Sequence, residues 1–212
     1  MNIKLVLVDD HELIINGIKA LLTPYPRYQI AGQVDNGLEV YRLCGETHPD
    51  IVILDLGLPG MDGQDVIAQL LKRWPALRII VLTSRRGEHY AAGVLRLGAL
   101  GFVLKSSPQH CLLTALQYVF NRKRYLDPAL DHFRVFQLMN ESGHHPLSLT
   151  LRERQVLKQI AEGAGNHAIA GNLSISPKTV ETHRLNIMRK LDVHKAIDLV
   201  HWSFRLGLVE YR

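Results

Sequence analysis

The chain has 212 residues and a net charge of +5, with 47% hydrophobic and 21% charged residues. This composition is typical of globular proteins and excludes collagen-like and low-complexity chains, and the length suits two small domains. No apolar run approaches the ~18 residues that a membrane helix needs. The first ten residues contain two aspartates and do not resemble a signal peptide. We therefore expect a cytoplasmic protein with no membrane contact, whose two cysteines, Cys44 and Cys111, stay reduced.

Strand-like apolar runs alternate with helical patterns through residues 1–125. The runs are 3–8, 29–34, 51–56, 78–83 and 101–105, and the helical patterns are 12–22, 37–47, 63–74, 88–98 and 109–121. This alternation predicts a parallel sheet covered on both faces. We predict an α/β domain of the (βα)5 type with the flavodoxin-like strand order 2-1-3-4-5.

The strand signal stops after Tyr125. Residues 126–147 mix Asp, Pro, Asn, Gly and paired His. We interpret this stretch as a linker, in which "LDHFRVFQLM" could form a short helix.

Residues 148–212 read as helical throughout. The segment "TLRE" at 150–153 is a capping-box pattern that opens one helix. A short helical segment at 166–173 follows, and Pro177 then begins a longer helix with Ser176 as its N-cap. Four helices, two of them joined by a tight turn, predict an all-α helix-turn-helix domain. Residues 147–212 carry a net charge of +4, which favours an anionic partner.

Three aspartates follow strands that this order makes neighbours. Asp9 and Asp10 come directly after the first run, and Asp55 stands at the end of the third. Ligands of open parallel sheets bind at the carboxyl ends of the strands, so the three carboxylates should converge. Because clustered carboxylates need a counter-ion, we predict a Mg²⁺ site there.

Two further polar residues end the next strands. Thr83 contributes a hydroxyl after the fourth run, and Lys105 contributes an ammonium after the fifth. A metal, a hydroxyl and an ammonium around one carboxylate suit phosphoryl transfer, because each can hold a phosphoryl oxygen. We predict that Asp55 is the nucleophile and forms an acyl phosphate.

Each of these residues also has a simpler interpretation. An aspartate after a strand is often only a turn residue, and Asp10 could cap the helix that begins near Glu12. His11 could tune Asp10 or sense pH, or it could be a partly exposed residue at a helix start. The common position of the polar residues at one end of their strands favours the phosphoryl site.

Several segments carry a family resemblance. The segments "LVDDHE", "ILDLGLPGMDG", "VLTS" and "GFVLK" resemble response-regulator receiver domains, and "LTLRERQVLKQIAEG", "ISPKTVETH" and "IMRKLDV" resemble the LuxR-type helix-turn-helix. Together they resemble the NarL/FixJ family of two-component response regulators over almost the whole chain, except the linker. The general character of the sequence is most similar to enterobacterial regulators of type III secretion genes, which would imply virulence regulation.

The resemblance implies a sensor histidine kinase as phosphoryl donor. It also implies Mg²⁺ contacts from Asp10, Asp55 and the backbone carbonyl of Gly57, with Asp9 assisting. Thr83 and Phe102 match the family's switch pair, in which the hydroxyl moves toward the phosphoryl group and the ring turns inward. Phenylalanine stands here where tyrosine is commoner, so a surface hydroxyl contact is absent, and Phe102 could equally be core packing.

The helix that begins at Pro177 is predicted to contact DNA. With Val180 facing the core, the helical period brings Ile187 and Leu191 to the same side. The opposite face carries Lys178, Thr182, Leu185 and Arg189. Its cations and hydroxyl can contact phosphates or bases, and its leucine can contact a thymine methyl.

Further residues flank this face: Thr179, Glu181, His183 and Lys190. Glu181 weakens nonspecific attraction to DNA but could accept a hydrogen bond from a cytosine amino group. His183 and Lys190 could reach the DNA backbone. The alternative is a merely solvated charged face.

The last helix carries two apolar stripes. Ile197, Val200 and Phe204 form one stripe, which we expect to pack on the domain. The second stripe, Leu199, Trp202 and Leu206, needs another surface, either a partner subunit or the first domain. The family resemblance implies a homodimer through this helix.

We interpret the chain as a transcription regulator, not an enzyme, that binds double-stranded promoter DNA as a dimer when phosphorylated; RNA polymerase is a possible further partner. Two alternatives remain. One is a metal-dependent phosphatase that uses the same acidic pocket, although the chain lacks a Gly-rich phosphate loop. The other is a phosphorylation-independent regulator whose first domain is only a dimerisation scaffold.

Overall fold

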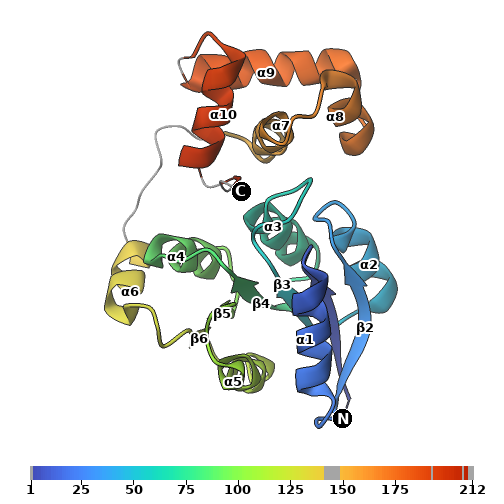
Figure 1. The fold of residues 1–212 in the computed structure, drawn as a ribbon, viewed down its shortest axis with the longest axis vertical. Helices are drawn as coiled ribbons and strands as arrows, with labels where there is room; N and C mark the ends of the chain where they lie inside the picture. The colour runs from blue at the N-terminus through green and yellow to red at the C-terminus, as the bar shows by residue number, and fades with distance from the viewer. Residues whose placement is uncertain (1, 141–148, 192, 207, 210–212) are drawn as a thin grey trace. The chain divides into compact units, whose positions relative to one another are not determined.

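The structure is a computed structural model that describes residues 2–140, 149–191, 193–206 and 208–209. These residues divide into two compact units (Figure 1). An α/β unit contains elements β1 to α6, and a helical unit contains α7 to α10. In the part of the chain so described, no helix has the length and apolar character needed to cross a bilayer.

The α/β unit is built on one parallel sheet. Its strands are β1 Ile3–Val8, β2 Tyr28–Val34, β3 Ile51–Leu54, β4 Arg78–Thr83, β5 Gly101–Leu104 and β6 Tyr125–Leu126. Their order is β2-β1-β3-β4-β5-β6, and every neighbouring pair is parallel. The predicted fold class and the order of the first five strands are confirmed, and the two-residue β6 extends the sheet beyond them.

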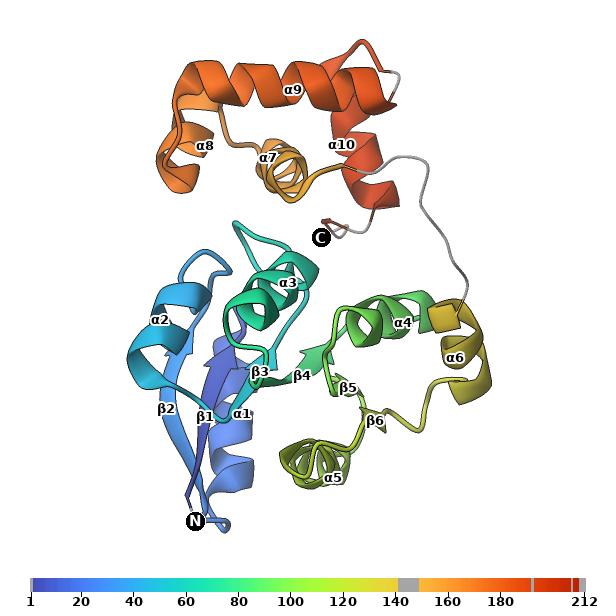
Figure 2. The same ribbon diagram turned by 180° about the vertical axis from the view of Figure 1, so that it is seen from behind.

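Five helices cover the two faces of this sheet. They are α1 Glu12–Leu22, α2 Val40–Thr47, α3 Gly63–Arg73, α4 Glu88–Arg96 and α5 Gln109–Phe120. Helices α1 and α5 lie on one face, and α2, α3 and α4 lie on the other (Figures 1 and 2). Because side chains alternate along a strand, Leu5 and Leu7 pack with α1 and α5, while Val6 and Val8 point to the other face. All four side chains are buried, as expected for strands covered on both sides.

Part of the stretch predicted to be a linker, 126–147, belongs to the α/β unit. Helix α6 spans His132–Asn140 and lies beside α4, with Val135 fully buried (Figures 1 and 2). Strand β6 pairs with β5, and the carboxylate of Asp127 then accepts the backbone N–H of Leu104 at 2.9 Å. The remainder of the predicted linker, from residue 141 on, lies outside the described residues.

The helical unit has the four predicted helices, α7 Leu151–Ala161, α8 Asn166–Leu173, α9 Pro177–Leu191 and α10 Ala196–Arg205. The predicted capping box is present at α7: the Thr150 side chain accepts the N–H of Glu153, whose carboxylate accepts the N–H of Thr150. At α9, the Ser176 hydroxyl accepts the N–H of Thr179 at 3.0 Å. Two N-terminal backbone donors that would lack intrahelical partners are satisfied in this way.

Candidate functional site

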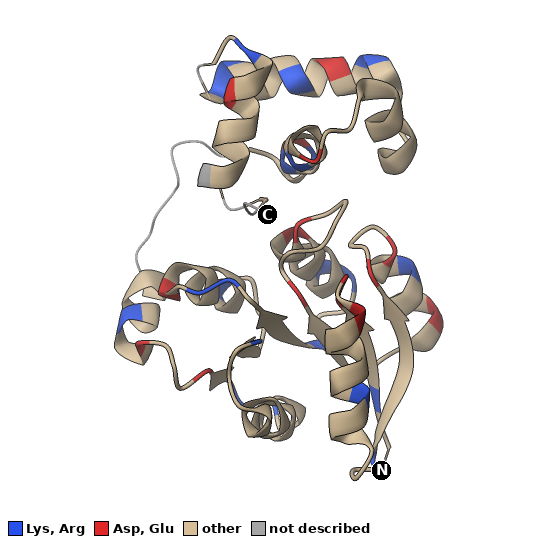
Figure 3. Ribbon diagram, viewed as in Figure 1, with Lys and Arg blue, Asp and Glu red and all other residues tan. Residues whose placement is uncertain are grey.

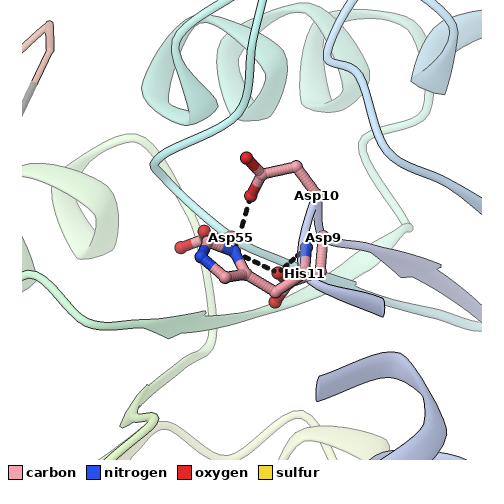
Figure 4. A group of neighbouring side chains, drawn as sticks. All are labelled: Asp9, Asp10, His11 and Asp55. Atoms are coloured by element: carbon pink, nitrogen blue, oxygen red, sulfur yellow. Dashed lines mark hydrogen bonds and ion pairs between the residues drawn. The ribbon is translucent and has the colours of Figure 1, made fainter. Parts of the chain in front are cut away.

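Four ionisable side chains meet at the carboxyl ends of β1 and β3. Asp9, Asp10 and His11 directly follow β1, and Asp55 directly follows β3. Their ligand atoms all lie within 4.8 Å of one another (Figure 4). Asp9 and Asp55 are buried, Asp10 is half-buried and His11 is exposed. Residues far apart in the sequence converge here because β1 and β3 are adjacent parallel strands.

Lys105 connects two of these carboxylates. Its Nζ lies 2.8 Å from Oδ2 of Asp9 and 2.9 Å from Oδ2 of Asp55. The Lys105 side chain is 8% exposed, and the side chains of Asp9 and Asp55 are 3% and 5% exposed. In this low-dielectric position each contact is stronger than a surface ion pair, but each charge also loses hydration.

Burial and the neighbouring charges have opposite effects on the pKa values of Asp9 and Lys105. Burial raises the pKa of Asp9, and this effect outweighs the opposing influence of the Lys105 ammonium. Burial alone would lower the pKa of Lys105, but the carboxylates of Asp55 and Asp9 raise it overall. Lys105 is therefore charged at neutral pH and neutralises only part of the acidic cluster.

The backbone after β3 lies tightly around Asp55. The N–H of Leu56 donates to Oδ1 of Asp55 at 2.7 Å. Gly57 lies against the same carboxylate, since a Cβ there would be 3.3 Å from Oδ2 of Asp55. Gly63, the first residue of α3, is closer still to the backbone: a Cβ would lie 2.7 Å from the Asp55 carbonyl oxygen. The start of α3 therefore holds the Asp55 loop in place.

Thr83 and Phe102 lie on the neighbouring strands. Thr83 ends β4 and is almost fully buried, and its Oγ1 accepts the N–H of Arg85 at 3.2 Å. Its backbone carbonyl accepts the N–H of Lys105, so both residues lie at the same edge of the sheet. Phe102 is 0% exposed and is among the largest fully buried side chains. The ring of Phe102 thus lies inside the α/β unit.

The acidic cluster suits a hard divalent cation. Asp9, Asp10 and Asp55 supply carboxylate oxygens, and hard cations prefer oxygen ligands. His11, expected either to tune Asp10 or to be a partly exposed residue at a helix start, is exposed, and its Nδ1 lies 2.8 Å from Oδ1 of Asp10 and 3.2 Å from Oδ1 of Asp9. Imidazole nitrogen is a poorer ligand for Mg²⁺ than carboxylate oxygen, so the aspartates are the better donors here.

In the helical unit, α9 has one buried and one exposed side. Val180, Ile187 and Leu191 are buried. The predicted DNA-contacting face is exposed at Lys178, Thr182, Leu185 and Arg189. Leu185 is 68% exposed. A large exposed apolar side chain is not expected on a helix face that only contacts water, and it favours a contact surface. Basic positions recur along α9 with an acidic position among them (Figure 3).

The residues that flank this face differ in exposure and in their intramolecular contacts. Glu181 is exposed and lies 3.0 Å from Nζ of Lys178, while Thr179 and His183 are half-buried. Nζ of Lys190 is 2.7 Å from Oε2 of Glu153, the capping-box residue of α7. Lys190, predicted to contact DNA, thus forms an ion pair within its own unit that the sequence did not predict.

One residue from each apolar stripe of α10 lies the opposite way round from expectation. Leu199, placed on the outer stripe by the sequence, is 0% exposed and faces the core of its own unit together with Ser203. Ile197, placed on the inner stripe, is 56% exposed. Trp202 and Leu206 are half-buried, as are Val200 and Phe204. The physical reason is that α10 packs against α7 through the side that carries Leu199 and the small Ser203.

Comparison with known proteins supplies the family. Residues 5–117 match the response regulator receiver domain, and residues 147–203 match the luxR family of bacterial regulatory proteins. The oxygen regulatory protein NreC of Staphylococcus carnosus is 32% identical over 216 residues, which cover 98% of this chain and 100% of NreC. This chain is a response regulator of the NarL/FixJ family. Its family is one of DNA-binding transcription regulators controlled by phosphorylation, not of enzymes.

Solved structures of other response regulators are similar to this one. A LuxR-family two-component response regulator from Aurantimonas sp. has 31% identity and a TM-score of 0.59, over 66% of this chain and 97% of that one. RcsB from Salmonella enterica, bound to promoter rprA with the phosphomimetic BeF3⁻, has 26% identity and a TM-score of 0.62, over 95% and 98% of the two chains. The narrower expectation of a type III secretion regulator gains no support from these relatives.

Sequence reasoning did not identify two residues that shape the sites of this response regulator. Gly63 gave no signal, because its importance comes from the close approach of α3 to Asp55. Glu153 was recognised as a cap, and a pairing with α9 could have been suspected only from the surplus of basic residues on that helix.

Proposed function

We propose that this response regulator accepts a phosphoryl group on Asp55 and binds promoter DNA as a dimer when phosphorylated. The proposal rests chiefly on one observation: Asp55 is held at the carboxyl edge of the sheet beside Asp9, Asp10 and Lys105. A sensor histidine kinase supplies the phosphoryl group. The Asp55 carboxylate attacks phosphorus, the bond from phosphorus to the kinase histidine nitrogen breaks, and an acyl phosphate forms.

The residues around Asp55 have separate roles in this transfer. Asp9, Asp10, Asp55 and the carbonyl of Gly57 would hold Mg²⁺, which offsets the negative charge on the phosphoryl oxygens. Lys105 leaves its contact with Asp55 to bind one phosphoryl oxygen, and its raised pKa keeps it charged for that purpose. Thr83 binds another oxygen through its hydroxyl. Phe102 serves as the partner of Thr83 in the switch.

The helical unit is the proposed DNA reader. Lys178, Thr182, Leu185 and Arg189 form an exposed face on α9 that can enter the major groove. Thr179, Glu181 and His183 flank it. Lys190 acts on DNA only to the extent that it is released from Glu153. RcsB, a relative, is described in a structure of two dimers bound to two parallel DNAs, which supports a dimeric mode for this chain.

The dimer surface is proposed on the apolar side chains of α10 that do not face its own core. Ile197 is the most exposed of them, and Trp202 and Leu206, from the stripe predicted for the dimer, are half-buried. The predicted boundaries are 1–125 for the receiver, 126–147 for the connection and 148–212 for the DNA reader; we propose that the receiver extends through α6 to Asn140, which shortens the connection accordingly. The protein acts in the cytoplasm, and RNA polymerase is a further partner on promoter DNA.

Binding to DNA with and without phosphorylation tests this function. Genomic fragments selected by the purified protein serve as the DNA, and affinity is measured with and without a small phosphodonor or BeF3⁻. We expect the phosphodonor to tighten binding by at least tenfold for the native chain and to have no effect on Asp55→Asn. Equal affinities under both conditions would refute phosphorylation control while leaving DNA binding intact.

A second candidate is a regulator whose receiver is only a scaffold. Phe102 favours it, because a fully buried ring without a hydroxyl fits simple core packing. Reporter output in cells separates the two: Asp55→Asn leaves it unchanged under the second candidate and alters it under the first.

A further inference from the structure

The α/β unit contains a pocket at the end of the sheet opposite the phosphoacceptor site. Its volume is about 270 Å³, and its wall includes Cys44, His48, Asp50, Trp74, Arg78 and Arg122. Arg78 is the first residue of β4 and Thr83 is the last. A six-residue strand spans roughly 17–20 Å, so the pocket is well separated from Asp55 and the acidic cluster.

Two arginines of this pocket have no anionic partner among the residues that the structure describes. Within the described ranges, neither Arg78 nor Arg122 takes part in an ion pair or a side-chain hydrogen bond. The Nε of Arg78 is buried and has no acceptor in the described part of the chain, while its guanidinium carbon lies 5.2 Å from the centre of the Phe120 ring. Buried hydrogen-bond donors in proteins are nearly always paired. An acceptor atom of a ligand in this pocket would pair with the Nε–H of Arg78.

The balance of charge on the pocket wall favours an anion. Against the two arginines, the wall carries one acidic side chain in the described part of the chain, that of Asp50. Oδ2 of Asp50 already accepts the backbone N–H of Lys4 at 2.9 Å. A guanidinium presents a planar fork of donors that matches a carboxylate in a bidentate geometry.

The rest of the wall is apolar. Trp74 contributes an indole ring, which also contacts Tyr41 at a centroid distance of 5.1 Å. Ala76 and Leu77 lie beside it. Burial raises the pKa of Cys44 to about 11, so its thiol is neutral and adds to the apolar surface. A flat ring would contact this part of the wall favourably.

We propose that this pocket binds a small organic anion of the aromatic carboxylate class, with the carboxylate between Arg78 and Arg122 and the ring against Trp74. The volume admits a ligand of about one ring, below the usual range for larger cofactors. The site is independent of the phosphoryl chemistry at the other end of the sheet.

Calorimetric titration of the full chain tests the proposal with three probes. Benzoate carries both the ring and the charge, inorganic phosphate carries the charge alone, and benzyl alcohol carries the ring alone. We expect saturable binding of benzoate at millimolar or lower concentration, with phosphate and benzyl alcohol at least tenfold weaker. In a Trp202→Phe background, benzoate should also change the fluorescence of Trp74, the remaining tryptophan.

Variants locate the binding. Arg78→Gln and Arg122→Asn should each weaken benzoate at least tenfold, and Arg96→Gln, an exposed arginine at the end of α4, should stay within twofold. Asparagine suits position 122 because the backbone φ there is +57°, a region that it tolerates. If Arg78→Gln does not fold, Arg122→Asn decides alone. Absence of saturable binding, equal binding of phosphate, or unchanged affinity in Arg122→Asn would overturn the proposal.

Discussion

The Nζ atom of Lys105 lies 2.9 Å from Oδ2 of Asp55, although β4 separates the strands that position the two residues. The N–H of Lys105 donates to the carbonyl of Thr83, and the N–H of Asp55 donates to the carbonyl of Val8, each at 2.9 Å. The sheet ladder thus fixes both backbones, and the long lysine side chain crosses the end of β4. This single contact joins the nucleophile to the strand that carries Phe102.

Replacement of Lys105 by methionine should impair phosphorylation and stability together. We expect labelling of the protein by a small phosphodonor to slow by about 10²-fold, because a charged donor to the transferred group is lost. Without Mg²⁺ the variant should lose ~3–5 kcal/mol of unfolding free energy, since two buried carboxylates lose their cation. Addition of Mg²⁺ should restore part of that stability.

Lys123→Met, at an exposed lysine after α5, is the matched control and should label at the native rate. Denaturant titration with and without Mg²⁺ measures the stability change. A Lys105→Met protein that labels as fast as the control would show that Lys105 does not serve phosphoryl transfer.

Gly63→Ala, at the first residue of α3, should displace the backbone of the loop that carries Asp55. The new Cβ would lie 2.7 Å from both the Asp55 carbonyl oxygen and the Cα of Leu56, so the backbone must shift. We expect a loss of about 1–3 kcal/mol in unfolding free energy, the usual cost of overpacking, and slower labelling of Asp55. Gly17→Ala, in α1 with nothing within 4 Å, should instead be stabilised by about 0.5–1 kcal/mol. Similar behaviour of the two variants would contradict the inferred role of Gly63.

Glu153 should stabilise the helical unit in a pH-dependent way. Burial alone would raise the pKa of Glu153, but the Lys190 ammonium and the Thr150 donors outweigh burial and lower it. A carboxyl with a lowered folded-state pKa contributes stability above its unfolded pKa of about 4.3, and that contribution disappears as pH falls through the folded value. Glu153→Gln should therefore cost about 1.5–3 kcal/mol at pH 7 and progressively less below pH ~4.

Chemical denaturation across pH, followed by the helical signal, measures this difference. Glu181→Gln is the control in the same unit, because Glu181 contacts Lys178 at the exposed surface, where an ion pair contributes little to stability. A constant difference between Glu153→Gln and the native chain from pH 7 to pH 3 would exclude the ionised carboxylate as the cause.

The phosphoacceptor cluster could be predicted from sequence because few physical rules determine it. Parallel strands bring their carboxyl ends to one edge, so Asp9, Asp55 and Lys105 had to lie at that edge once the strands were recognised. The strand β6 and the place of α6 could not be predicted in the same way. Only two residues pair with β5, and a single fully buried side chain, Val135, anchors α6, so the pattern indicates a possible short helix but not its packing beside α4.

The orientation of α10 shows where pattern alone fails. Both of its stripes are apolar, so the period does not say which one faces inward. The deciding residues are Leu199 and Ser203, both 0% exposed, and a buried serine gives no hydrophobic signal. The Ser203 hydroxyl is satisfied locally by donating to the carbonyl of Val200 at 2.6 Å, which is what allows it to be buried.

The corrected orientation of α10 makes opposite predictions for two neighbouring residues. Ile197→Ser should weaken dimerisation of the phosphorylated protein at least tenfold while changing unfolding free energy by less than about 0.5 kcal/mol. Leu199→Ala should instead destabilise the helical unit by about 2–5 kcal/mol through the cavity it leaves. Sedimentation analysis and denaturation measure the two effects. If Leu199→Ala were as stable as the native chain but monomeric, Leu199 would belong to the dimer surface and not to the core of the helical unit.

Direct mapping of the phosphoryl group tests the central claim. The full chain is incubated with Mg²⁺ and a small phosphodonor, the acyl phosphate is trapped by borohydride reduction, and the modified residue is located by peptide mass spectrometry. We predict modification at Asp55, its loss in Asp55→Asn, and strong reduction when Mg²⁺ is chelated. Modification at another residue, or undiminished labelling of Asp55→Asn, would contradict the account.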